Sequence, residues 1–585
     1  MSFEGDTISA RLLMGLRTAS ARASSRAKLV CPVETLDAPD RRVPWLWLFA
    51  ATVLISILLL NLPGRASIPP LVGSDYCYQL VAADRLLAGL GPTAPRPVAP
   101  LQPWEWQADW GFLTQWPIGY SLLVCARRAV TGAATIQACQ WISVVAVSLA
   151  LVGWFAWMKR VLPGGVTGTL LAAVAAGCSV STAMLINPTT DVLLVAALPF
   201  VMLVVRQAIQ RPDGPMAGTS RLRADAPMLM AGVMCGALVW IRYAAVFVPV
   251  AVAAYLLVER LLRRRVGLRQ IGVFAVSAAL PIATLLVINR AYGMASSVQS
   301  QLNLGHTTGF DFSTDHLRTA WWNFSTFGFY DYHWYSPWVF ALWPLLVAAI
   351  VLAVRHTRRT AGVFLRAPGV QLSACVVIAL LIMLVGVTTV FGGKYDYVSQ
   401  IRYYAPVKPL YFLLFVTPLA LIPARTVKAA FCVVLLVACS WTVRQEWQRP
   451  YERWLAANRE VTPFGQWARC FEPGAAGLYR WLRTQSADNL IVVSNFHDHV
   501  TLETQIPALP IPPDTETLER WVQRIRRSRS ITDPRVLFVL DRDNRWRDYW
   551  IKPTPEIMDT FGLRTPAAGV PEEVSAQVFE YRRAS

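Results

Sequence analysis

Apolar residues run through the first three quarters of the chain in long stretches, and short polar segments separate them. A helix crosses the hydrocarbon core of a bilayer with about 17–25 residues of this kind. We expect a membrane span in each of eleven stretches: 43–62, 138–158, 166–186, 189–205, 227–241, 244–258, 270–289, 337–354, 370–390, 405–422 and 429–443. The pattern therefore predicts an all-α polytopic membrane bundle over residues 43–443.

The charged residues between these spans alternate in a way that orients the bundle. The segments that begin near residues 159, 206, 260, 355 and 425 together hold 17 lysines and arginines. All five segments lie on one side of the membrane if the N-terminus lies there too, and positive charge marks the cytoplasmic side. We therefore expect residues 1–42 to form a cytoplasmic segment and the C-terminus to lie outside.

The composition excludes two broad classes of protein. The 585 residues are 55% hydrophobic and 16% charged, whereas a soluble domain carries about 25% charged residues. An ordinary soluble enzyme and a disordered chain are thereby excluded. The net charge of +19 belongs mostly to the cytoplasmic segments, so it does not indicate nucleic acid as a partner.

Three segments on the outer side are long: 63–137, 290–336 and 444–585. The first two are rich in Trp and Tyr, which favour the headgroup layer of a membrane. The first segment also contains an apolar stretch at 117–124. A crossing there would reverse the side of every later basic segment, so we predict an interfacial helix instead.

Residues 444–585 are more polar and are predicted to fold as a small periplasmic α/β domain. Residues 490–493 and 536–540 are short apolar runs typical of buried strands. Between them, residues 515–529 carry Leu518, Trp521 and Ile525 at helical spacing. Strands that alternate with helices indicate an α/β arrangement.

Two acidic residues stand where the predicted topology meets the outer membrane surface. Asp75 follows the first span by about a dozen residues, and Asp191 lies at the turn between two spans. A carboxylate near the membrane is costly to desolvate, so it is a functional candidate by default. The alternative for Asp191 is that it caps the N-terminus of its helix. The alternative for Asp75 is a purely structural role.

Basic residues at the outer surface are few. Arg242 ends one predicted span, while Lys394 and Arg402 flank a short outer loop. An anionic ligand such as a lipid phosphate would compensate them, because a guanidinium binds phosphate with two parallel hydrogen bonds. The alternatives are contact with lipid headgroups and, for the loop, pairing with Asp396.

Histidine and cysteine spacing supports no metal site and no firmly implied cofactor, although a divalent metal stays possible. His497-Asp498-His499 is the closest approach to ligand spacing, and we interpret it as a solvated loop. No C-x-x-C pair is present. Cys77 and Cys470 would both face the oxidising side, and whether they pair is left open.

Several short motifs resemble those of the GT-C superfamily of integral-membrane glycosyltransferases, in particular the bacterial relatives of aminoarabinose transferase and protein O-mannosyltransferases. The motifs, in chain order, are Gly73-Ser74-Asp75-Tyr76 leading into a helix over 80–91, Gln115-Trp116-Pro117-Ile118-Gly119-Tyr120, Asn187-Pro188-Thr189-Thr190-Asp191, Arg242-Tyr243 and Arg402-Tyr403-Tyr404-Ala405-Pro406. An outer α/β tail is also common in this group.

The resemblance implies an enzyme of the inner membrane. Such an enzyme moves a sugar from a polyprenyl-phosphate carrier to a glycan, lipid or protein acceptor on the periplasmic face. Asp75 would deprotonate or orient the acceptor hydroxyl, and Asp191 would assist near the acceptor or a metal. Arg402, with Arg242 or Lys394, would hold the donor phosphate. The substrate-binding set that the resemblance implies is completed by Tyr403, Trp116 and Tyr120.

One position departs from the pattern. The aminoarabinose and mannosyl transferases carry a basic residue before the proline of the interfacial segment, and this chain has Trp116. Phosphate binding must then rest on other groups, or the donor differs. Two alternatives remain: a polymerase or ligase of lipid-linked glycans, which would not need Asp75, and a polytopic transporter or flippase, which usually shows internal repeats.

Overall fold

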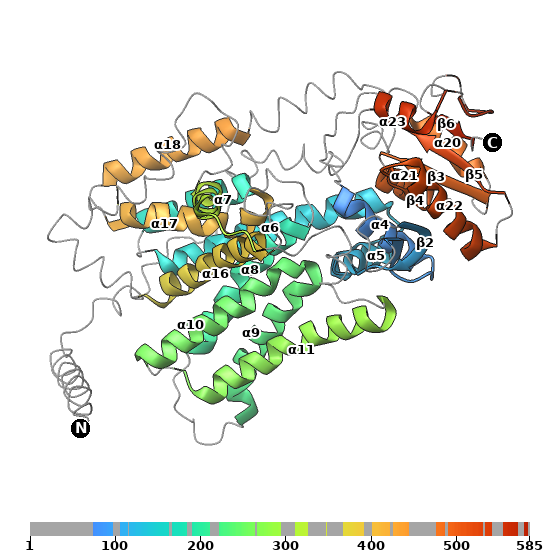
Figure 1. The fold of residues 1–585 in the computed structure, drawn as a ribbon. Coiled ribbons are helices and arrows are strands. Elements are labelled where there is room, and N and C mark those ends of the chain that lie inside the picture. Colours follow the sequence, from blue (N-terminus) through green and yellow to red (C-terminus); the bar gives the residue numbers. More distant parts are fainter. Residues whose placement is uncertain are drawn as a thin grey trace, which may run out of the picture.

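A computed structural model gives the fold (Figure 1). It describes residues 74–97, 106–114, 116–162, 166–183, 190–210, 221–263, 266–293, 310–325, 347, 367–390, 401–421, 425–443, 475–485, 489–495, 497–530, 533–540, 554–564, 566–570, 572 and 578–582. The predicted spans at 43–62 and 337–354 lie outside this description, apart from Val347, and so does the segment 1–42.

Helices occupy every other predicted span. They are α6 (Thr135–Val161), α7 (Val166–Ala183), α8 (Thr190–Gln210), α9 (Arg221–Ile241), α10 (Phe247–Arg263), α11 (Leu268–Gly293), α16 (Pro368–Val390), α17 (Lys408–Leu421) and α18 (Arg425–Val443). Within the described residues, five helical segments are long and apolar enough to cross a bilayer: Gln137–Val161, Thr190–Ile209, Tyr243–Arg263, Leu268–Tyr292 and Pro368–Val390. The chain is accordingly an integral membrane protein.

Close backbone contact joins α9 to α11, which lie side by side in Figure 1. Gly232 and Gly236, one turn apart on α9, face α11, and a Cβ atom at Gly236 would lie under 3.0 Å from the carbonyl oxygen of Ala278. In a membrane, no hydrophobic force drives two helices together, so their association depends on close packing. Small residues at this spacing allow that packing because they let the two backbones approach closely. The glycine pair therefore sets the position of α9 and of the residues that follow it.

Buried tryptophans join α6 to its neighbours by polar contacts. The Trp154 indole Nε1–H donates a hydrogen bond to the Val195 carbonyl in α8 at 2.9 Å. The Trp157 Nε1–H donates to Ser373 Oγ in α16 at 3.2 Å. A buried N–H needs such a partner because its desolvation is otherwise uncompensated. Both contacts hold α8 and α16 against α6.

The segment 63–137, which we call the first outer segment after its predicted side, contains α4 (Ser74–Leu87), the antiparallel strands β1 (Thr93–Pro97) and β2 (Trp106–Phe112), and α5 (Gly119–Thr131). The helix expected over 80–91 begins earlier and ends at Leu87, and Gly89 and Gly91 beyond it have positive φ angles of 77° and 75°. Asp75 is thus part of the helix. At 1.5 Å per residue, α5 is about 20 Å long, which is too short for the bilayer core.

The C-terminal sheet has the strand order β4-β3-β5-β6, with β6 antiparallel and the others parallel. Its elements are α20 (Ala475–Thr484), β3 (Leu490–Ser494), α21 (His497–Thr504), β4 (Ala508–Leu509), α22 (Thr515–Arg529), β5 (Arg535–Val539), α23 (Thr554–Phe561) and β6 (Val578–Tyr581). The two predicted strands and the predicted helix are confirmed as β3, β5 and α22. The Asp514 side chain caps α22 by accepting a hydrogen bond from the Thr517 N–H at 2.7 Å.

The C-terminal elements lie beside α4 and α5 (Figure 1). Leu502 of α21 is buried in one apolar cluster with Cys77, Leu80 and Val81 of α4. The strand β2 of the first outer segment also contacts α22 and β4. The first outer segment is therefore packed between the bundle and the C-terminal sheet.

Candidate functional site

An ion pair between Asp191 and Arg242 forms the centre of the candidate site. Asp191 is the second residue of α8, and its side chain is 2% exposed; Arg242 follows the last residue of α9, and its side chain is 14% exposed. The same guanidinium nitrogen, Nη1, donates to Thr190 Oγ1 at 3.2 Å. Loss of one partner of such a buried pair strongly destabilises the protein, because the other charge stays buried without compensation.

A tyrosine ring brings a second arginine to this pair. The Arg242 guanidinium lies 4.8 Å from the ring centroid of Tyr403, and the Arg402 guanidinium lies 5.2 Å from the same centroid. Tyr403 belongs to the short 3-10 helix η3 (Ile401–Val407), which packs on α8. Aromatic rings attract cations through their negative faces. Two guanidinium groups and one carboxylate thus share a small volume, which favours an anionic ligand.

The local backbone explains why Arg242 and the next residue reach different partners. The helix α9 ends at Ile241, and Arg242 has an extended backbone (φ −154°, ψ 127°). Helical structure resumes with the 3-10 helix η2 (Tyr243–Val246). The Tyr243 hydroxyl donates to the Thr114 carbonyl at 2.9 Å and accepts a hydrogen bond from Asn289 Nδ2 at 2.8 Å. The interrupted helix therefore links α8 on one side with the first outer segment on the other.

The first outer segment meets the end of α9 at close range. Gly119, the first residue of α5, lies against Trp240, and a Cβ atom at position 119 would lie under 3.0 Å from the Trp240 carbonyl oxygen. Trp116 stacks on Tyr78 of α4, with 5.3 Å between ring centroids and 19° between ring planes. Both residues pack in one apolar cluster with Tyr243. This cluster positions the N-terminal half of α4 beside the residue that follows Arg242.

The predicted site residues fall into three groups. Asp191, Arg242, Arg402 and Tyr403 come together, and Arg242 contacts Asp191, Thr190 and Tyr403. Trp116 lies on the neighbouring cluster just described, whereas Tyr120 is 1% exposed and packs with Cys77 and Cys139. Lys394 lies outside the described residues. The backbone of Asp75 is in α4, and its side chain is outside the description.

The interpretation of His497-Asp498-His499 as a solvated loop is wrong. These residues form the first turn of α21, and Asp498 and His499 are 3% and 8% exposed. Burial against α4 causes the difference, and this contact partner lies more than 400 residues away in the sequence. Burial lowers the pKa of His497 and raises the pKa of Glu503 to about 7, the latter against the opposing charge of Arg483.

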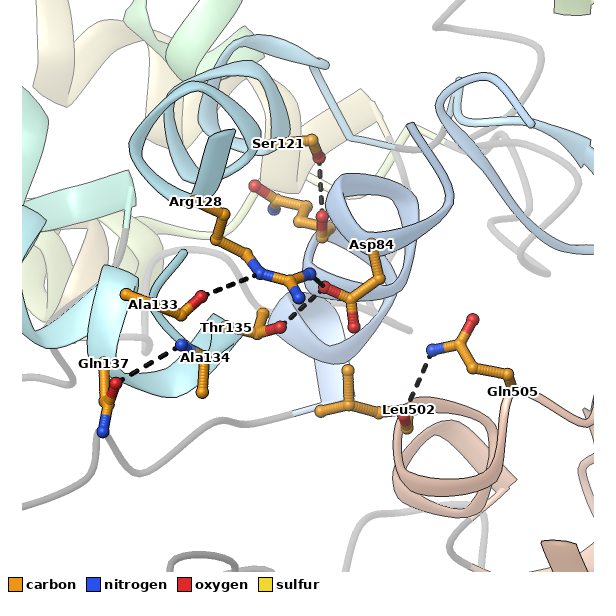
Figure 2. Close-up of polar contacts among 10 residues, drawn as sticks. Asp84, Ser121, Arg128, Ala133, Ala134, Thr135, Gln137, Leu502 and Gln505 are labelled. Carbon is orange, nitrogen blue, oxygen red and sulfur yellow. Dashed lines mark hydrogen bonds and ion pairs between the residues drawn. The ribbon is translucent and has the colours of Figure 1, made fainter. Parts of the chain in front are cut away.

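A second polar network, missed in the sequence, fastens α4 to α5 and α6 (Figure 2). Asp84 of α4 forms an ion pair with Arg128 of α5 and accepts a hydrogen bond from Thr135 Oγ1 of α6 at 2.6 Å. Burial raises the pKa of Asp84, and Thr135 and Arg128 oppose this rise. Nearby, Ser121 Oγ donates to the Gln79 carbonyl at 2.7 Å. The charges alone gave no signal of this pairing, because 44 residues separate Asp84 from Arg128.

Comparison with known proteins finds no matching family model and no matching curated protein. Among solved structures, the chain is similar to ArnT from Cupriavidus metallidurans bound to undecaprenyl phosphate, with 13% identity and a TM-score of 0.47 over 86% of this chain and 94% of that chain. It is also similar to the archaeal oligosaccharyltransferase AglB from Archaeoglobus fulgidus in complex with an inhibitory peptide and a dolichol-phosphate, with 14% identity and a TM-score of 0.45 over 85% and 69%. At this level of similarity, the function has to be argued from the residues themselves.

Proposed function

We propose that this chain is a membrane glycosyltransferase that moves a sugar from a polyprenyl-phosphate carrier to a cell-envelope acceptor on the periplasmic face. One observation carries the proposal. Asp191, Arg242 and Tyr403 belong to three of the motifs quoted above, are far apart in the sequence and meet in one cluster. The proposed topology has eleven spans, a cytoplasmic N-terminus and a periplasmic C-terminal α/β domain over residues 444–585.

The phosphate of the donor is proposed to bind at the two guanidinium groups. Asp191 neutralises and orients Arg242, which also contacts Thr190 and the Tyr403 ring. Arg402 lies against the same ring and adds a second positive charge. We assign Arg402 the main contact with the donor phosphate, with Lys394 as a further proposed cation. Fixed donors of this kind stabilise the negative charge that develops on the phosphate as the carrier leaves.

The acceptor is proposed to be activated by Asp75. This residue precedes Tyr78 by three positions, so the two positions share one face of α4, and Tyr78 stacks on Trp116 beside the end of α9. In the proposed step, the acceptor oxygen attacks the anomeric carbon while Asp75 takes its proton. The bond between that carbon and the carrier phosphate breaks, and its electron pair leaves with the phosphate. General-base help is worth about 10²–10⁴-fold in rate.

The test is transfer from the lipid-linked sugar pool of the host membrane. We expect Asp75→Asn to insert normally and to lose at least about 100-fold in transfer rate, the lower limit for a lost general base. Arg402→Ala should raise the donor concentration needed for half-maximal rate. The matched controls are Asp225→Asn and Arg269→Ala, which remove the two partners of an ion pair between α9 and α11 whose arginine is exposed and whose aspartate is partly buried.

Two results would contradict the proposal. Transfer by Asp75→Asn at the wild-type rate would remove the general base, and an unchanged donor dependence in Arg402→Ala would favour simple contact with lipid headgroups. If the proposal holds, mass analysis of envelope glycans from cells with and without the protein would identify the sugar and the acceptor.

A further inference from the structure

Three side chains with metal-binding atoms converge where α21 packs on α4. Cys77 of α4 and Asp498 and His499 of α21 each offer one ligand atom, and these atoms all lie within 4.8 Å of one another. The three residues are buried, with exposures of 0%, 3% and 8%. The ligands come from opposite ends of the chain, so their convergence is a product of the contact between α4 and α21.

The donor set matches zinc better than the hard cations. A thiolate, an imidazole and a carboxylate together are typical zinc ligands, whereas Mg²⁺ and Ca²⁺ prefer oxygen ligands throughout. Tetrahedral zinc with bonds of about 2.0–2.3 Å holds its ligand atoms about 3.4–3.6 Å apart. The observed separations reach 4.8 Å at most, so the ligand atoms have to approach one another by about 1 Å to reach the spacing of a zinc site.

A second contact orients the imidazole. His499 Nδ1 lies 3.1 Å from Asp498 Oδ1, and the His499 backbone N–H donates to the same oxygen at 2.9 Å. The separation of 3.1 Å is close to the spacing of two ligand atoms on one zinc ion, so Nδ1 and the Asp498 carboxylate can bind the same metal side by side.

We propose that Cys77, Asp498 and His499 bind one Zn²⁺ ion that fastens the C-terminal sheet to α4. Water completes the four-coordinate site. The proposal does not rest on sugar transfer: positions 75 and 77 lie on different faces of α4, and the metal has a structural role at the contact between two parts of the chain.

The full-length protein, purified in detergent and stripped with a chelator, provides the test. We expect one zinc ion per chain after reloading, measured by elemental mass spectrometry. With Co²⁺ in place of zinc, we expect the charge-transfer absorption of a thiolate–cobalt bond. Cys77→Ser should abolish that absorption, and both Cys77→Ser and His499→Gln should weaken zinc binding about 10–100-fold or more, the scale on which a changed partner alone affects metal sites.

The matched control is Cys125→Ser, which removes a partly buried thiol of α5 that packs against the same apolar cluster. It should bind zinc and cobalt as the wild type does. The proposal is overturned if the wild-type protein shows no thiolate–cobalt absorption, a result that needs no variant to fold. It is equally overturned if Cys77→Ser retains that absorption or binds as much zinc as the wild type.

Discussion

Removing one partner of the ion pair between Asp191 and Arg242 should be far more costly than removing both. Asp191→Leu leaves the guanidinium of Arg242, whose side chain is 14% exposed, without its carboxylate. The loss of one partner of a buried pair destabilises a protein by about 3–5 kcal/mol. Replacing both partners with apolar residues of similar size is often neutral. We therefore expect Asp191→Leu combined with Arg242→Met to recover most of the lost stability.

Equilibrium unfolding in mixed micelles measures these free energies, and transfer activity is measured on the same samples. The control is Asp225→Leu, which breaks the pair with Arg269. Asp225 is 16% exposed, but the arginine left behind is 59% exposed and stays in contact with water. Exposed pairs contribute about 0–1 kcal/mol, so this variant should be nearly neutral.

The double variant separates structure from function. If Arg242 binds the donor phosphate, the double variant is stable but inactive, because methionine supplies no positive charge. The reasoning is refuted if Asp191→Leu costs no more than Asp225→Leu. It is also refuted if the double variant transfers sugar at the wild-type rate, since the pair would then have a structural role alone.

Two further predictions concern the first outer segment. Gly119→Ala should cost about 1–3 kcal/mol, the usual range for overpacking, and should slow transfer because α5 is pushed from Trp240. The control is Gly272→Ala in α11, where the space is open; it should leave transfer unchanged and should not destabilise the protein, since alanine favours a helix over glycine. Equal destabilisation by the two variants would contradict the packing argument. Burial raises the pKa of Asp84 in the folded protein above its pKa in the unfolded chain. Ionisation of Asp84 therefore opposes folding as the pH rises from the unfolded-state pKa through the folded-state pKa. The unfolding free energy of the wild type should fall relative to Asp84→Asn over that pH range, and a pH-independent difference would contradict the buried environment of the ion pair with Arg128.

The membrane helices could be predicted from the sequence because a bilayer acts on contiguous residues. Each spanning segment must be apolar along its length and must satisfy its own backbone hydrogen bonds, so α6, α8 and α16 were visible in the chain without any knowledge of their neighbours. The strands β3 and β5 were visible for a related reason, since a strand buried on both faces is a short continuous apolar run.

The hairpin of β1 and β2 was not predicted. Pro95 and Pro97 lie in β1, and proline removes the backbone N–H that an ordinary strand uses for pairing. The ladder tolerates them with a register shift between Pro95 and Arg96. A local pattern of hydrophobic and polar positions contains no information about such a compensation by the partner strand.

The sequence by itself determined which segments are apolar enough to enter the membrane and which motif residues are candidates for chemistry. The tertiary structure alone decided that Asp191 pairs with Arg242, that Asp84 pairs with Arg128, and that His499 is buried beside Cys77. The physical reason is range. Hydropathy is a property of neighbouring residues, whereas the partner of a buried charge is set by whichever helix packs against it. That helix lies 44 residues away for Asp84 and more than 400 residues away for His499.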